Sequence, residues 1–251
     1  MYRHFENPTD MEDDIEIEPW PPIELVGRAV VLATLARRYA IELESQEEGD
    51  PFDLETQRFD LSAWSRTELA SWLTDEELRI LQTANGELTS DDSDACEDAI
   101  VGGVALMWVL GVLPQASLPW GEDDRLERAL LEWAPEPWGN VRPLVKRVQV
   151  RSVEDLAFER ERWELWYWRS SFPEVLDAES LGAIAEAAAD VTEAGLIATR
   201  NNDFLVDDRT FGELDELERE AIAATSFARL HALNWACGLG KTWESTPLLI
   251  D

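Results

Sequence analysis

An apolar run in the middle of the sequence constrains the fold more than any other feature. The stretch "AIVGGVALMWVLGVL", residues 99–113, contains no charged residue and directly follows two acidic residues, Glu97 and Asp98. Acidic residues favour the first turns of a helix, and Pro114 ends the run because proline cannot continue a helix. The run is too short to cross a bilayer comfortably, since a membrane-spanning helix needs about 20 apolar residues. It therefore predicts a buried helix at the centre of a folded domain.

The rest of the chain is predicted to form helices around that centre. Apolar residues recur at helical spacing in several further stretches: 23–44, 65–81, 123–134, 153–171, 178–198 and 214–237. The segment "NDFLVDDRTFGEL" predicts a small β-hairpin with Asp207 and Asp208 at its turn, and residues 144–150 have an extended pattern. We expect a mainly α fold, in which residues 21–251 form a single helical domain with the hairpin before the last long helix. Residues 1–20, acidic and flanked by prolines, are expected to form an N-terminal arm.

Side chains that cap helices predict where several helices begin. A hydroxyl followed three residues later by a glutamate forms a capping box, in which both side chains accept hydrogen bonds from free backbone amides. The segment 44–53 is expected to be a loop. The predicted helix starts are Ser65 with Glu68, Thr74 with Glu77, Asp94 before the apolar run, and Ser152 with Asp155.

The charge balance is strongly acidic and bears on the possible partners. The sequence has 53 acidic against 21 basic residues and a net charge of −32. Such a surface repels nucleic acids and anionic membranes, which are bound through Lys and Arg. The acidic charge has two interpretations. It serves solubility or adaptation to high salt, or it steers a basic protein partner toward the surface. The predicted contact segments are 10–18, 44–50 and 87–98, and the candidate partner-binding residues are Asp91, Asp92 and Asp94.

Cysteine content and the first residues bear on the compartment and on cofactors. The start "MYRHFENPTDMEDD" lacks the basic and apolar regions of a signal peptide, so we expect a cytoplasmic protein. The only two cysteines, Cys96 and Cys237, lie in apolar helical patterns and are expected to be buried free thiols. Neither cysteines nor histidines occur at metal-ligand spacing, and we expect no metal and no cofactor.

One short motif suggests nucleotide binding. Gly240-Lys241-Thr242, in "CGLGKTWEST", matches the end of a phosphate-binding loop. The complete motif requires a glycine at position 235, which is Trp235 here, and a helix after the threonine. The motif is therefore expected to be incidental.

The sequence contains no complete catalytic motif, which leaves two functional hypotheses. The leading one is a non-catalytic cytoplasmic binding protein, for example an immunity or regulatory protein, that captures a basic partner. The alternative is a hydrolase or transferase with a pocket near the last helix, where a buried histidine beside an arginine and an acid has a tuned pKa. Its candidate catalytic residues are Arg229, His231, Asn234 and Glu244.

Four stretches in the same order resemble the bacterial domain-of-unknown-function 4272 family. They are "VGRAVVLATLARRYAIE" (26–42), "ALMWVLGVLPQASLPW" (105–120), "DFLVDDRTFGELDELE" (203–218) and "ARLHALNWACGLGKTWESTPLLID" (228–251). Where the family usually has Trp-Asp-Asp near its end, this chain has Trp243-Glu244-Ser245. The resemblance implies a helical domain with a small hairpin, in which "GLGKTWE" links the last helix to the tail, and it implies no activity.

Overall fold

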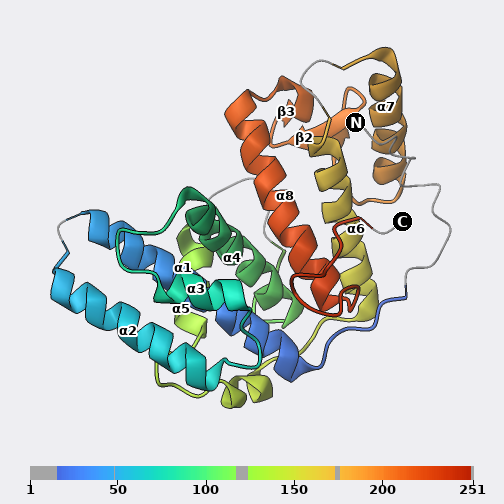
Figure 1. The fold of residues 1–251 in the computed structure, drawn as a ribbon. Helices are drawn as coiled ribbons and strands as arrows, with labels where there is room; N and C mark the ends of the chain where they lie inside the picture. Colours follow the sequence, from blue (N-terminus) through green and yellow to red (C-terminus); the bar gives the residue numbers. More distant parts are fainter. Residues whose placement is uncertain (1–15, 48, 117–123, 173–175, 250–251) are drawn as a thin grey trace.

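The computed structural model describes residues 16–47, 49–116, 124–172 and 176–249, most of which form α-helices (Figure 1). The predicted mainly α, single-domain fold with a small antiparallel sheet before the last helix is confirmed. The elements in chain order are α1 (Pro22–Gln46), α2 (Pro51–Glu68), α3 (Asp75–Gln82), α4 (Ser90–Val109), α5 (Asp124–Trp133), η2 (Arg142–Arg147), α6 (Val153–Ser170), α7 (Ala178–Glu193), β1 (Thr199–Arg200), β2 (Asp203–Val206), β3 (Arg209–Thr210), η3 (Phe211–Glu213) and α8 (Glu216–Ala236).

Helix α4 lies at the centre, packed against α1 on one side and α8 on the other (Figure 1). This confirms the buried central helix predicted from the apolar run, although α4 begins earlier, at Ser90, and ends at Val109. The small residue Gly102 brings all three helices close together. A Cβ atom there would lie 3.5 Å from Leu32 of α1 and 3.6 Å from Ala232 of α8. The core is therefore continuous across the two halves of the molecule.

The two halves differ in their elements (Figure 1). In one half, α2, α3 and α5 pack against α1. In the other, α6 lies alongside α8, while α7 contacts the small sheet. The described part of residues 1–20, the predicted arm, is residues 16–20, which run beside the end of α8.

Two predicted helix starts are confirmed and two are wrong. Thr74 forms the expected capping box with Glu77, and Ser152 accepts a hydrogen bond from the Asp155 amide. Ser65 instead lies inside α2, where its hydroxyl donates to the Leu61 carbonyl oxygen at 2.7 Å. The start predicted at Asp94 is wrong because a capping box between Thr89 and Asp92 begins α4 one turn earlier. The loop expected over 44–53 is shorter, since α1 continues to Gln46 and α2 begins at Pro51.

The predicted hairpin is confirmed and has an additional strand. Strands β2 and β3 pair antiparallel across the turn at Asp207 and Asp208, with Val206 opposite Arg209. Strand β1 extends the sheet on the other side of β2. The extended pattern over 144–150 is only partly correct, because residues up to Arg147 form the 3₁₀ helix η2.

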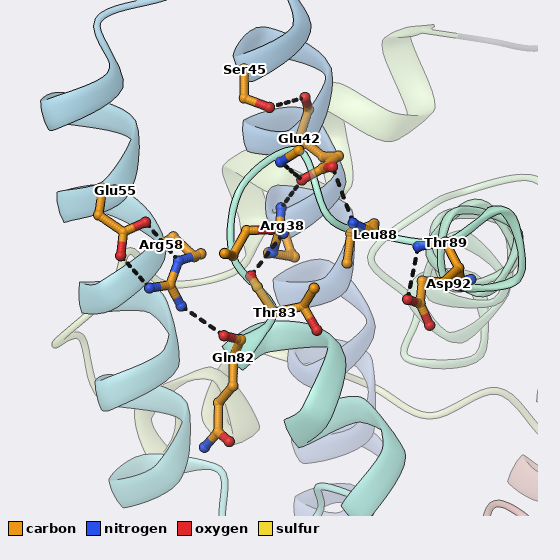
Figure 2. Close-up of polar contacts among 12 residues, drawn as sticks. Arg38, Glu42, Ser45, Glu55, Arg58, Gln82, Thr83, Leu88, Thr89 and Asp92 are labelled. Carbon is orange, nitrogen blue, oxygen red and sulfur yellow. Dashed lines mark hydrogen bonds and ion pairs between the residues drawn. The ribbon is translucent and has the colours of Figure 1, made fainter.

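A buried ion pair on α1 fixes the loop between α3 and α4 (Figure 2). Arg38 is fully buried, and its Nη1 donates a hydrogen bond of 2.9 Å to Glu42 Oε2. Arg38 Nη2 also donates to the Thr83 carbonyl oxygen at 3.0 Å. Glu42 in turn accepts hydrogen bonds from the backbone amides of Gly86 and Leu88, at 3.0 and 3.3 Å. The pair thus satisfies several backbone groups of this loop.

Among the helices of the described residues, none combines the length and the apolarity needed to cross a membrane.

Candidate functional site

A cleft of about 410 Å³ lies where the start of α1, the segment before α3 and the segment after α8 meet. We refer to it as the tryptophan cleft, because four indole rings line it. These are Trp20, Trp72, Trp235 and Trp243, and the charged residues beside them are Glu24, Arg28, Asp75, Lys241 and Glu244. Its volume lies within the range of about 300–1,000 Å³ that is typical of ligand pockets.

Residues before α1 form one wall by pairing with the end of α8. The backbone amides of Glu18 and Trp20 donate to carbonyl oxygens of residues 237 and 236, at 3.1 and 3.2 Å. The chain approaches so closely at Gly238 that a Cβ atom there would lie 2.2 Å from the Glu18 carbonyl oxygen. Gly238 also has a φ of +80°, which glycine adopts without strain. This pairing stacks Trp20 on Trp235, with ring centroids 6.0 Å apart.

Arg28 forms the floor of the cleft. Its guanidinium is only 2% exposed and forms a two-pronged ion pair with the Glu77 carboxylate, with Nη1 donating to Oε2 at 3.0 Å. Nη1 also donates to the Trp72 carbonyl oxygen at 3.0 Å. The guanidinium carbon lies 4.1 Å from the centre of the Trp243 ring, which gives a cation–π contact. Arg28 is therefore fixed, and its charge is neutralised by Glu77.

Trp243, in the segment after α8, is held from behind by His231. The His231 Nε2–H donates to the Trp243 carbonyl oxygen at 3.0 Å, and the two rings meet edge to face at 4.4 Å. Burial lowers the pKa of His231 below its ordinary value, so the imidazole is neutral near pH 7. His231 thus supports one wall of the cleft and does not line it.

The opening of the cleft is acidic. Glu24, Asp75 and Glu244 supply three carboxylates, and the Glu24 carboxylate accepts a hydrogen bond of 2.9 Å from the Trp72 indole. Lys241 is the only lining cation among the described residues besides the neutralised Arg28. Aromatic faces beside carboxylates favour a cationic ligand. No histidine or cysteine is among the described lining residues, so the site lacks the usual base for nucleophilic catalysis.

The predicted catalytic candidates do not converge on one point. Glu244 lies in the cleft and His231 behind it, whereas Arg229 lies elsewhere, with its guanidinium 4.5 Å from the Trp163 ring centre. Burial lowers the pKa of Arg229 to about 10. Arg229 borders a second cavity of about 10 Å³, which holds about one water molecule and no substrate.

Asn234, the fourth candidate, has a structural role. It is fully buried, and its Oδ1 accepts a hydrogen bond of 2.8 Å from Arg160 Nε. Its Nδ2 donates to the carbonyl oxygens of Pro247 and Leu248, at 2.8 and 3.0 Å. Asn234 therefore fastens the segment that carries Trp243 to the rest of the domain.

The predicted partner-binding aspartates are not equivalent. Asp91 and Asp94 are exposed on the first turns of α4. Asp92 is only 3% exposed, and its carboxylate accepts hydrogen bonds from the Thr89 amide and from Arg79. The Arg79 guanidinium holds the pKa of Asp92 below its usual range. Its carboxylate is thus committed to the fold, and only the two exposed aspartates are accessible to a partner.

Asp98, further along α4, gives a pH-dependent prediction. Burial, with help from Asp94 and Glu97, raises the pKa of Asp98 to about 6. The unfolded chain loses this proton near pH 4, so stability falls as the pH rises from there through about 6. We expect Asp98→Asn to raise the free energy of unfolding most above pH 7, with the gain shrinking as the pH falls toward about 4.

Urea unfolding over a pH series measures this gain, with the exposed Glu193→Gln as a charge-matched control. The control should change stability little at any pH. An equal gain from Asp98→Asn at every pH would contradict the raised pKa.

The glycine–lysine–threonine segment does not form a phosphate-binding loop. Over 237–249 the described chain makes turns and no helix, and the Thr242 amide donates to the Ser245 hydroxyl at 3.0 Å. Among the described residues, no group of three or more His, Cys, Asp or Glu side chains is placed to hold a metal ion.

Comparison with known proteins gave no match. Neither a family profile, nor a curated protein, nor a solved structure matches the chain.

Several cleft residues were not identified from the sequence: Trp20, Arg28, Trp72 and Asp75. The one available signal was Arg28, a charged residue within an apolar helical stretch, because buried arginines are rare unless paired.

Proposed function

We propose that the protein is a non-catalytic binding protein that captures a basic protein partner. The observation that carries this proposal is an acidic, tryptophan-lined cleft on a chain with a net charge of −32. Aromatic side chains in a concave site provide most of the affinity in many interfaces, while charge provides selectivity and speed of association.

The exposed acidic segments support the same proposal. Glu44 and Glu47 at the end of α1, and Asp91 and Asp94 on α4, are exposed. A surface of this kind attracts a basic protein from a distance and raises its association rate. It also disfavours nucleic acids and anionic membranes as partners.

The chemistry of the cleft supports binding over catalysis. The hydroxyl of Thr74 accepts the Glu77 amide in a helix cap, and that of Thr242 donates to Ser245. Ser71 supplies the third lining hydroxyl, and none of the three has a histidine beside it among the described lining residues. A nucleophile needs an adjacent base to be activated.

On this proposal the protein acts in the bacterial cytoplasm, for example as an immunity or regulatory protein. The setting rests on the resemblance to the bacterial domain-of-unknown-function 4272 family. Immunity proteins neutralise a partner by binding alone, which requires no catalytic residue.

Capture from a lysate of the native host tests the proposal. The immobilised protein should retain a basic protein at about 0.1 M salt and release it at about 1 M, because the Debye length falls from about 10 Å to about 3 Å. An unrelated protein of similar negative charge is the control and should not retain the same partner. Retention that is indifferent to salt, or the absence of any basic protein, would contradict the proposal.

A hydrolase or transferase remains the second candidate, and the position of the cleft at the end of α8 favours it. Glu244 would then act as the general base, since it is the one predicted catalytic residue that lines the cleft. Turnover of ester or phosphoester substrates that is lost in Glu244→Gln would establish this alternative. Undetectable turnover in a protein that still captures its partner would exclude it for those substrates.

A further inference from the structure

We infer that the tryptophan cleft binds an arginine side chain of the basic partner. This inference rests on the proposed function and identifies the site and the chemical group through which capture occurs. Binding of an arginine side chain requires three properties of the cleft. It must prefer a cation, it must prefer a planar cation, and its aromatic walls must be in place before the ligand binds.

The charges of the cleft favour a cation. Three carboxylates line it, and one of its two cations, Arg28, is already paired with Glu77. Asp75 and Glu244 are exposed, and neither carboxylate accepts a hydrogen bond from the part of the chain that the structure describes, so both are accessible to an incoming guanidinium. A carboxylate on the partner would meet repulsion from the same groups.

The buried donors do not create an anion site. Trp20 Nε1 and Arg28 Nε have no hydrogen-bond acceptor among the described residues, but both atoms are shielded from solvent. A ligand in the open part of the cleft does not reach them. The accessible surface therefore consists mainly of ring faces, carboxylate oxygens and a few hydroxyls, with the exposed ammonium group of Lys241 beside them.

The aromatic walls favour a guanidinium over an ammonium group. Arg28 places its guanidinium 4.1 Å from the Trp243 ring centre, which shows a guanidinium packed on an indole within the cleft and leaves the other ring surfaces for a ligand. A planar, weakly hydrated guanidinium stacks on indole rings and pairs with carboxylates through two parallel hydrogen bonds, whereas an ammonium group is a strongly hydrated point charge.

The walls are held in place before a ligand binds. Trp243 is fixed by His231, and Trp20 is fixed against Trp235 by backbone hydrogen bonds. Preorganised rings lose little entropy on binding, which leaves more of the contact energy for affinity.

Fluorescence anisotropy with a labelled hexa-arginine peptide tests the inference. The wild-type protein should bind this peptide about fivefold more tightly than hexalysine, and should not bind the neutral analogue hexacitrulline. Hexalysine binding as tightly as hexa-arginine would overturn the preference for arginine.

A matched pair of double variants locates the site. The cleft variant Asp75→Asn/Glu244→Gln should weaken hexa-arginine binding about tenfold, because two ion pairs are lost. The control Glu186→Gln/Glu193→Gln removes the same charge from exposed positions on α7, away from the cleft, and should change binding less than about twofold. Circular dichroism and thermal unfolding check that both variants fold.

The outcomes separate this inference from the proposed function. Equal binding by the two double variants would overturn the cleft as the site, while salt-sensitive capture of the natural partner would still support the proposed function. If the wild-type protein binds none of the basic peptides at low salt but still captures a partner, only the inference fails. If it captures neither, both fail.

Discussion

Arg38→Met is expected to lower the free energy of unfolding by about 3–5 kcal/mol. The substitution removes the cation from a fully buried ion pair and leaves the Glu42 carboxylate buried without its partner (Figure 2). It also removes a hydrogen-bond donor from the Thr83 carbonyl oxygen, so the loop between α3 and α4 loosens. Urea unfolding followed by circular dichroism measures the change.

The same region of the molecule offers a control. Arg58 pairs with Glu55 on α2, but the Glu55 side chain is 53% exposed (Figure 2). Arg58 also donates a hydrogen bond of 3.0 Å to the Gln82 carbonyl oxygen, so Arg58→Met should cost about 1–2 kcal/mol, clearly less than Arg38→Met. Equal losses of unfolding free energy for the two substitutions would show that burying the Arg38 ion pair does not make it more important for stability than an exposed pair.

Trp64→Ala is expected to cost about 3–5 kcal/mol, the range for removing a large aromatic side chain from a core. Trp64, on α2, is only 1% exposed, and its indole Nε1 donates to the Gly139 carbonyl oxygen at 2.9 Å. The substitution leaves a cavity and deprives a backbone carbonyl of its donor. Thermal or urea unfolding measures the loss.

Trp138, in the loop after α5, provides the contrast. Its side chain is 60% exposed, so Trp138→Ala should change stability by less than about 1 kcal/mol. Similar losses of stability for both substitutions would mean that the Trp138 indole is packed in solution. The difference in exposure between Trp64 and Trp138 would then not explain their contributions to stability.

Sequence patterns predicted those elements that local interactions determine. The apolar run alone indicated that α4 is buried, and the Thr74–Glu77 capping box lies within a single turn of chain. The start of α4 was misplaced because two capping signals compete there. Thr89 forms the cap with Asp92, which leaves Asp94 inside the helix.

The first half of α8 shows a second limit of sequence patterns. The sequence predicts an apolar stripe along the last helix through Leu217, Ala221 and Ala224, yet Leu217 is 76% exposed. The buried face of α8 runs instead through Ile222, Ser226 and Leu230. Small alanines on the stripe fit a buried or an exposed surface equally well, so spacing alone does not decide which face packs.

The cleft was beyond prediction for a different reason. Its residues come from four separate segments, and their proximity depends on tertiary packing. Twelve tryptophans offer no pattern that separates a cleft wall from the core, as Trp243 and Trp64 illustrate. Asn234 and His231, two of the candidate catalytic residues, hold the wall of the cleft in place and do not line it.

The pairing of residues 18 and 20 with the end of α8 has a consequence for the order of assembly. Trp20 leaves the ribosome early, whereas Lys241 and Glu244 emerge only after the whole helical core has been synthesised. Contacts between such distant segments form late in folding, because the intervening chain must be ordered first. A nascent chain therefore lacks the cleft until synthesis has reached the segment after α8.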